Sequence, residues 1–471
     1  MSSSADLAQR LEGLTMKFAE FVANLHYEDL PADVVQKAKL HLRDGVGNQI
    51  AASAIGESAK HVIALAEEWG GARQSTVVGY GLKLPTPMAA MCNAMLGHGV
   101  ELDDAHGSGL VKSGSVLVPS AFAIAEQTGA SGKDVITAVV AAYEIAIRIA
   151  KAINPGHRQR GYHTTGTVSP FGAAALTAKL LGCDAEKTAW ALGLAGMQSA
   201  GIQSYLADPC LAKPFSPGKA AFNGVLAGIL ASRGLSGPRT VLESHEGFFK
   251  AFTDQVKLEE LDIDGLGDRF CLMEVGFKPH AACRYAHGPI DLAQSFHAEE
   301  GITIDDVDHA VSHMSELSIR QASKPVCANL NVAMGSTEFG VALGLDRGVN
   351  GLRSYWDGYK DKRLHEAAAD KITLKAEPEF GVGGRQAVLE VTLKNGRVLK
   401  RRQEEPKGEP SNPLSPEQLE QKFMDMACIV LEENDAAKIG ERLMTLETEA
   451  NAGVVPAMTV VGSGKPALRA A

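Results

Sequence analysis

The chain has 471 residues, of which 45% are hydrophobic and 6% aromatic, and its formal net charge at neutral pH is −10. A chain of this length forms two or three domains with ample buried core. Its acidic balance argues against a nucleic-acid partner, because the one short basic run, at residues 400–402, is isolated. Abundant alanine and glycine with few aromatic residues favour closely packed helices over a β-sandwich.

Cysteine usage and hydropathy both point to a cytoplasmic protein. The seven cysteines include no Cys-x-x-Cys pair, which indicates reduced thiols and not a disulfide framework or a zinc site. The N-terminus lacks the pattern of a signal peptide. The apolar stretch at residues 135–149 is interrupted by Glu144 and Arg148 and is too short to cross a bilayer. We therefore expect no membrane partner.

Helical periodicity dominates the first 260 or so residues. Apolar residues recur at three- and four-residue spacing in segments 7–25, 32–54, 88–97, 131–153, 171–181, 185–197 and 220–232. Ser131-Gly-Lys-Asp is a helix start, and Asn154-Pro155-Gly156 is a helix stop. The small residues in these segments predict that the helices pack close together.

Strand signals appear after about residue 265. Strands are predicted at 307–315, 372–376, 386–393 and 398–401, with an Asn395-Gly396 turn joining the last two, and a helix at 289–297. Helices return at 415–427 and 436–446, and the tail from about Gly453 is expected to be loosely ordered. The sequence thus predicts a mainly α protein with a smaller α+β domain. Both chain ends, residues 1–268 and 405–471, would form the large helical domain around an inserted α+β domain at 269–404.

Four polar clusters interrupt the apolar segments. They lie at residues 98–114, 158–167, 213–219 and 278–287, and each joins a cation or a histidine to glycine or proline close to a helix. Helix N-termini favour anions, so convergence of these loops would build a pocket for a small polycarboxylate. Removal of a proton next to a carboxylate builds up negative charge, which such cations stabilise.

Structural roles compete with the chemical ones. A histidine such as His163 is more often a hydrogen-bonded structural residue, and Lys213 or Lys278 taken singly would be solvated. Cys283 would be a small buried hydrophobe. Asp103 and Asp104 with His106 do not make a convincing metal site, because adjacent carboxylates point in different directions and no His-Glu-x-x-His motif accompanies them.

Taken together, the four clusters resemble the MmgE/PrpD family. The specific stretches are HGVELDDAH at 98–106, GYHTTGTVSPFGAAALTAKLLG at 161–182, KPFSPGKAAFNGVLAGILASRG at 213–234 and FKPHAACRYAH at 277–287. The resemblance covers nearly the whole chain. It implies a large all-helical domain formed by both chain ends, an inserted α+β lid domain, a homodimer, and neither a metal nor an organic cofactor.

The resemblance also implies roles for individual residues. His163 is the leading acid/base candidate, with Lys112, Lys278 and Asp103 as further catalytic candidates. The residues implied to bind the substrate are His98, Asp104, His106, Lys213, Cys283, Arg284 and Tyr285.

Three positions depart from the family pattern. Members usually carry His-Pro where this chain has Lys112-Ser113, and a histidine where it has Ser216. Decarboxylase-type members have a histidine at the position of Cys283. These differences leave the substrate open, and Lys112 is a candidate cation for an additional carboxylate.

The function that follows is a cofactor-independent enzyme acting on a small di- or tricarboxylate by proton abstraction next to a carboxylate. A lyase of the 2-methylcitrate dehydratase or aconitate decarboxylase kind is the main hypothesis. The alternatives are an epimerase of the iminodisuccinate epimerase kind and a relative that binds carboxylates without catalysis.

Overall fold

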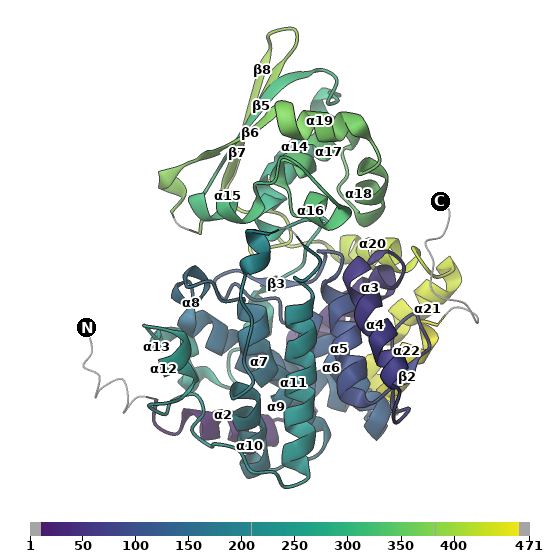
Figure 1. The fold of residues 1–471 in the computed structure, drawn as a ribbon. Helices are drawn as coiled ribbons and strands as arrows, with labels where there is room; N and C mark the ends of the chain where they lie inside the picture. The colour runs from purple at the N-terminus through teal and green to yellow at the C-terminus, as the bar shows by residue number, and fades with distance from the viewer. Residues whose placement is uncertain (1–10, 209, 382, 461–471) are drawn as a thin grey trace. The chain divides into compact units, whose positions relative to one another are not determined.

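The computed structural model describes residues 11–208, 210–381 and 383–460, and in it the chain divides into two compact units. The first comprises residues 1–99, 103–275 and 426–471, and the second comprises residues 100–102 and 276–425. Figure 1 shows the helices and strands along the chain. The expected fold class, mainly α with a smaller α+β part, is confirmed.

The first unit is built almost entirely of helices. They are α2 (Leu14–Asn24), α3 (Ala32–Ile55), α4 (Glu57–Trp69), α5 (Thr86–His98), α6 (Gly114–Thr128), α7 (Gly132–Ile153), α8 (Gly156–Gln159), α9 (Thr164–Leu180), α10 (Ala185–Gly196), α11 (Phe215–Ser232), α12 (Phe248–Phe252), α13 (Leu258–Leu261), α21 (Glu433–Met444) and α22 (Val455–Met458). Its short strands are β1 (Ser75–Thr76), β2 (Lys83–Leu84) and β3 (Ala105–His106), and β4 (Val275–Gly276) lies at its boundary. Both ends of the chain contribute to this unit, and α21 packs on α3 (Figure 1).

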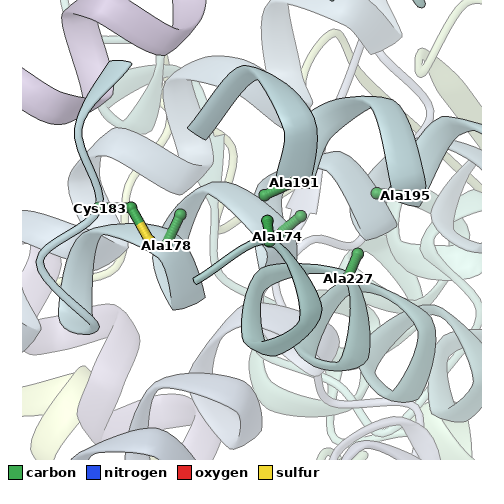
Figure 2. Close-up of a cluster of buried hydrophobic side chains, with 7 residues drawn as sticks. Ala174, Ala178, Cys183, Ala191, Ala195 and Ala227 are labelled. Atoms are coloured by element: carbon green, nitrogen blue, oxygen red, sulfur yellow. The ribbon is translucent and has the colours of Figure 1, made fainter. Parts of the chain in front are cut away.

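Small residues allow the central helices of this unit to approach closely. Ala174 and Ala178 of α9, Ala191 and Ala195 of α10, and Ala227 and Ala231 of α11 gather with Cys183 in one buried cluster (Figure 2). A Cβ atom added at Gly224 of α11 would lie 2.5 Å from the Cβ atom of Ala173. The expected tight helical core is therefore present.

Capping residues set the limits of α7. The Asp134 N–H donates to Ser131 Oγ, and the Ser131 N–H donates to the Asp134 carboxylate, which makes a capping box at the N-terminus. The helix ends at Ile153, immediately before Asn154 and Pro155. Both limits agree with the sequence signals.

Prolines misled the prediction at two other helices. Helix α9 begins at Thr164, seven residues before the expected start, and carries Pro170 in its interior. Helix α6 was not predicted at all, and it contains Pro119. A proline removes one backbone hydrogen bond without stopping a helix whose two sides are buried, as those of α6 and α9 are.

The second unit contains a four-stranded sheet with the order β6-β5-β7-β8. Its strands are β5 (Val307–Met314), β6 (Ile372–Ala376), β7 (Ala387–Leu393) and β8 (Val398–Gln403). β5 and β6 are parallel, with Ala310 opposite Ile372, and β7 is antiparallel to both β5 and β8. The hairpin turns at Gly396, whose φ of 83° suits glycine, so the Asn-Gly prediction is confirmed.

Helices cover one face of this sheet, with α14 packed on β7 and α17 on β6 (Figure 1). The helices of the unit are α14 (His287–Glu300), α15 (Glu316–Ala322), α16 (Leu330–Met334), α17 (Thr337–Arg347), α18 (Leu352–Gly358), α19 (Lys362–Asp370) and most of α20 (Pro416–Ala427). The sequence predicts residues 405–425 in the helical domain and residues 269–275 in the inserted domain, but the former belong to the second unit and the latter to the first. Within this unit Lys422 Nζ donates to the carbonyl oxygen of Leu102 at 2.9 Å, a contact that sequence order does not reveal.

The C-terminal segment is more ordered than expected as far as Val460. Ala452–Val454 forms a 3-10 turn, and α22 follows it directly. The Ala452 N–H donates to the Ala130 carbonyl oxygen at 2.8 Å, which ties this segment to the loop before α7. The rest of the predicted loose tail, residues 461–471, lies outside the described residues. Among the described residues, no helix combines the length and apolar character that crossing a membrane requires.

Candidate active site

Three helices of the first unit begin close to one another: α6 at Gly114, α9 at Thr164 and α11 at Phe215. The Lys112 N–H donates to Thr165 Oγ1 at 3.1 Å, which joins the starts of α6 and α9. Ser216 Oγ packs on Gly166, where an added Cβ atom would lie 2.1 Å from it, which joins the starts of α9 and α11. Three helix N-termini therefore gather in one place. The Asp104 carboxylate already accepts from the Gly114 N–H of α6, so the ends of α9 and α11 are the two that favour a further anion.

His163 lies at the centre of this arrangement, as the residue immediately before α9. Its side chain is buried, with 1% of the residue exposed. The main-chain N–H of His163 donates to the Gly201 carbonyl oxygen at 3.0 Å. The ring packs edge-on against Tyr205, with ring centroids 5.7 Å apart, and lies 6.1 Å from the ring of His98. Nδ1 of His163 has no hydrogen-bond partner among the described residues.

The pKa of His163 lies well below its ordinary value. Burial is the main cause, and the neighbouring Arg158, His98, Lys112 and Lys213 side chains lower it further. The imidazole is therefore neutral at neutral pH. His163 is thus a neutral, buried base with cationic side chains near it.

His98 and Asp103 form a buried pair beside His163. Nδ1 of His98 lies 2.6 Å from the Asp103 carboxylate, and both side chains are almost fully buried. An ionised carboxylate accepts, so His98 donates from Nδ1, and the pair fixes both the orientation and the tautomer of the ring. Two of the predicted site residues are thus brought together next to the leading candidate.

Asp104 has a different environment from its neighbour. The Gly114 N–H donates to Oδ1 at 3.0 Å, and the Tyr143 hydroxyl donates to Oδ2 at 2.5 Å. Nδ1 of His41 lies 3.1 Å from the same Oδ2 atom. The Asp104 carboxylate therefore holds the start of α6, and its predicted contact with substrate remains a prediction.

His106 is also engaged with the protein. The Gly109 N–H donates to Nδ1 at 3.0 Å, so Nε2 carries the proton and donates to Glu274 at 3.0 Å. This hydrogen bond, with Lys151, lowers the pKa of Glu274 to about 2. Both ring nitrogens therefore have protein partners, and the predicted contact of His106 with substrate remains a prediction.

Lys278 belongs to the second unit and is completely buried. Its Nζ atom donates to the Glu101 carbonyl oxygen at 3.0 Å and to Glu101 Oε2 at 3.2 Å. Glu101 has a φ of 54°, in the left-handed region. Sequence reasoning missed Glu101, although it lies in the middle of the first motif.

The other predicted residues of the second unit lie around the 3-10 turn that follows Lys278. The buried Arg284 guanidinium binds Glu409 at 2.6 Å and also donates to the Phe277 carbonyl oxygen. The ring of Tyr285 lies 5.1 Å from the Arg385 guanidinium. Cys283 is half-buried, and its N–H donates to the Met334 carbonyl oxygen. Their roles toward substrate remain predictions.

A metal site was not expected from the sequence. Within the part of the chain that the structure describes, no three His, Cys, Asp or Glu side chains are grouped so that they could hold a metal ion.

Comparison of the chain with models of known protein families identifies its family. The model of the MmgE/PrpD N-terminal domain matches residues 16–261, and that of the MmgE/PrpD C-terminal domain matches residues 280–447. The chain belongs to the MmgE/PrpD family. The resemblance read from the four motifs is thus confirmed.

Curated relatives of this MmgE/PrpD chain carry one recurring name. A cis-aconitate decarboxylase of Aspergillus terreus is 33% identical over 296 residues, which is 60% of each chain. The human cis-aconitate decarboxylase is 26% identical over 487 residues, covering 97% of this chain and 98% of the human protein. The cis-aconitate decarboxylase-like protein oryM of Aspergillus oryzae is 27% identical and covers 93% and 95% of the two chains. The match therefore spans about three fifths of the A. terreus protein but nearly all of the other two.

The structure adds residues that the MmgE/PrpD motifs did not single out. Arg158 and Tyr205 surround His163, and His41 and Tyr143 hold Asp104. Arg158 lies inside the second polar cluster, so its charge was a usable signal. Tyr143 and His41 lie inside long helices, and no local pattern marks them as neighbours of Asp104.

Two of the positions at which the sequence is expected to depart from the family pattern, Lys112 and Ser216, lie around His163. Lys112 is half-buried just before α6, and Ser216 occupies the first turn of α11. Ser216 Oγ is buried without a hydrogen-bond partner among the described residues, and a Cβ atom added at Gly201 would lie 2.7 Å from it and 3.6 Å from His163 Cβ. Both departures therefore alter the surroundings of the same imidazole.

Proposed function

We propose that this MmgE/PrpD protein is a cofactor-independent lyase that acts on a small di- or tricarboxylate. The observation that carries the proposal is the neutral, buried His163 at the meeting point of three helix N-termini, with Arg158, Lys112 and Lys213 around it. The names of the relatives support a lyase and make a tricarboxylate the first substrate to test. We further propose that the enzyme works as a homodimer.

His163 serves as the acid/base group in this proposal. A neutral imidazole accepts a proton from the carbon next to a carboxylate, and elimination follows when a β-hydroxyl group leaves as water. In a decarboxylation the carbon–carboxylate bond breaks, carbon dioxide departs, and the electron pair left on carbon takes a proton. Both reactions need one positioned proton carrier and a site that tolerates negative charge.

The surrounding cations stabilise the negative charge that both reactions produce. Substrate carboxylates bind where the positive ends of α9 and α11 and the Lys112 and Lys213 side chains act together. Charge that develops on the reacting carbon is stabilised by the same groups, because they are fixed before the reaction begins. Lys112 supplies one cation more than the usual family pattern, which favours a substrate with an additional carboxylate.

The His98–Asp103 pair places a second imidazole near the first. Epimerisation requires proton carriers on two faces of one carbon. The rings of His98 and His163, with centroids 6.1 Å apart, are two candidate carriers, so an epimerase is one alternative to the lyase. Loss of catalysis with retention of carboxylate binding is the other alternative, and the departures at Lys112, Ser216 and Cys283 motivate it.

A substrate panel separates these outcomes. Purified protein is incubated with cis-aconitate, citrate, 2-methylcitrate and iminodisuccinate in deuterated water, and carbon dioxide release, double-bond formation and deuterium incorporation are measured. Carbon dioxide release or dehydration supports the lyase. Deuterium exchange with inversion supports the epimerase, and binding without exchange supports the non-catalytic relative.

The role of His163 is tested with a matched histidine pair. His163→Ala should remove nearly all turnover while the far-ultraviolet circular dichroism is unchanged, because the proton carrier is lost. His245→Ala, at an exposed histidine of the same unit, should leave kcat unaltered. A near-normal kcat in His163→Ala would exclude its acid/base role.

A further inference from the structure

Asp104 is held by side chains from helices that are distant in sequence. Tyr143 comes from the middle of α7, His41 from α3, and the Gly114 N–H from the first residue of α6. All of these groups are buried, and the Tyr143 and His41 side chains both approach the Oδ2 atom. The carboxylate thus receives a donor at Oδ1 and two neighbours at Oδ2, so its position is fixed from both sides.

The fit around this carboxylate is tight. A Cβ atom added at Gly114 would lie 2.6 Å from Asp104 Oδ2 and 2.7 Å from the Tyr143 hydroxyl oxygen. Glycine is therefore required at this position if the hydroxyl and the carboxylate are to meet. Burial and the Asp104 charge raise the pKa of Tyr143 well above its ordinary value, so the phenol keeps its proton and remains the donor.

Asp104 is joined directly to Asp103, which is the partner of His98. The Asp103 carboxylate can fix the His98 tautomer only if the Asp103 main chain stays in place. That main chain continues directly into Asp104, whose side chain is anchored by Tyr143. We propose that Tyr143 and His41 are positioning residues, which hold Asp104 so that Asp103 keeps His98 protonated at Nδ1 and turned toward His163. The two act on catalysis only through Asp103 and His98.

This inference rests on the proposed function for its kinetic readout but not for its spectroscopic one. Tyr143→Phe removes one oxygen and keeps the ring. It should lower kcat at least tenfold on whichever polycarboxylate the wild type turns over, with KM changed less than threefold, because substrate carboxylates are bound elsewhere. Tyr80→Phe is the matched control, since Tyr80 donates to the Ser53 carbonyl oxygen in the same unit and lies outside the site.

The spectroscopic readout needs no substrate. With ¹⁵N-histidine labelling, and with the His98 signal assigned by its loss in His98→Asn, the wild type should show His98 protonated at Nδ1. That signal should move in Tyr143→Phe and stay in place in Tyr80→Phe. Gly114→Ala, which pushes on the same carboxylate from α6, should reproduce the Tyr143→Phe pattern if the tyrosine variant is too unstable to study.

The outcomes are distinct. A kcat for Tyr143→Phe within twofold of the wild type, or a fall in kcat with the His98 signal unmoved, overturns the positioning role. A wild type that is inactive on every polycarboxylate overturns the proposed function instead, and the His98 signal alone then decides this inference. Movement of the signal in both Tyr143→Phe and Tyr80→Phe overturns it as well.

Discussion

At the scale of single residues, the site depends on a histidine whose charge state is set by its surroundings. Burial and four positively charged or protonatable neighbours keep His163 neutral in the unliganded protein. A polycarboxylate brings negative charge to the same place and opposes the effect of Arg158, Lys112 and Lys213. Ligand binding must therefore raise the pKa of His163, and proton affinity and ligand affinity are linked.

The first prediction is that a polycarboxylate binds with net proton uptake at neutral pH. Isothermal titration calorimetry in buffers of different ionisation enthalpy measures the number of protons directly. The wild type should take up a fraction of a proton per ligand, and His163→Gln should take up less. Equal uptake by the two proteins would place the titrating group elsewhere.

The second prediction concerns Lys112, where the chain departs from its family. Lys112→Gln removes a cation near His163 without adding bulk. It should raise KM for a tricarboxylate about tenfold or more and for a dicarboxylate much less, because a hydrogen bond to a charged group contributes roughly 1.5–3 kcal/mol. Lys133→Gln, at an exposed position of α7, serves as the control. Equal changes for both substrates would show that Lys112 does not face a third carboxylate.

At the scale of elements, the structure shows which local signals were sufficient. The limits of α7 and the β7–β8 hairpin followed from a capping box, an Asn-Pro stop and an Asn-Gly turn, all of which act within a few residues. The first turns of α9 and α11 did not follow. Helix α9 continues through the buried Pro170, and Pro217 lies in the first turn of α11, where a proline costs no intrahelical hydrogen bond. His163 and Ser216 lie at these two turns. The sequence therefore predicted which segments matter better than it predicted how they are arranged.

The third prediction tests the close packing that brings these turns together. Gly224→Ala places a methyl group 2.5 Å from Ala173 Cβ and 2.6 Å from the Pro170 carbonyl oxygen, so α11 must move away from α9. Overpacking of this kind costs about 1–3 kcal/mol, and kcat should fall because Ser216 and Lys213 move with α11. Gly156→Ala, where an added Cβ atom meets nothing within 4 Å, should change neither quantity. Urea unfolding and steady-state kinetics measure both.

At the scale of the whole molecule, the chain leaves its first unit and returns to it. The sequence predicted a discontinuous helical domain from the recurrence of helical periodicity near the C-terminus. The structure instead gives residues 100–102 and 405–425 to the second unit, where Lys422 and Lys278 bind the main chain at Leu102 and Glu101. Contacts between residues more than 170 positions apart leave no periodic pattern, which is why neither segment was predicted.

Two buried groups of the first unit make opposite contributions to its pH stability. His157 donates from Nδ1 to the Phe252 carbonyl oxygen and accepts from Thr167 Oγ1, and burial lowers its pKa to about 4. The unfolded chain, with an ordinary pKa of about 6.5, binds this proton first, so stability is lost as pH falls from about 6.5 to about 4. Burial raises the pKa of Glu144 to about 7, so its contribution is lost as pH rises from about 4.5 to about 7.

The fourth prediction uses substitutions to separate the contributions of His157 and Glu144 to the pH dependence of stability. The wild type should show a shallow pH dependence between pH 6.5 and pH 5, because the His157 and Glu144 terms oppose each other. His157→Asn keeps a donor for the Phe252 carbonyl oxygen and removes the titration. It should be less stable than the wild type at pH 6.5, and that deficit should shrink by about 1.5 kcal/mol at pH 5, from the change in proton binding alone. Glu144→Gln should show the opposite trend, with a deficit that grows toward pH 5. Urea unfolding at the two pH values measures both differences, and a His157→Asn deficit that is constant with pH would show that this imidazole titrates at its ordinary pKa in the folded protein.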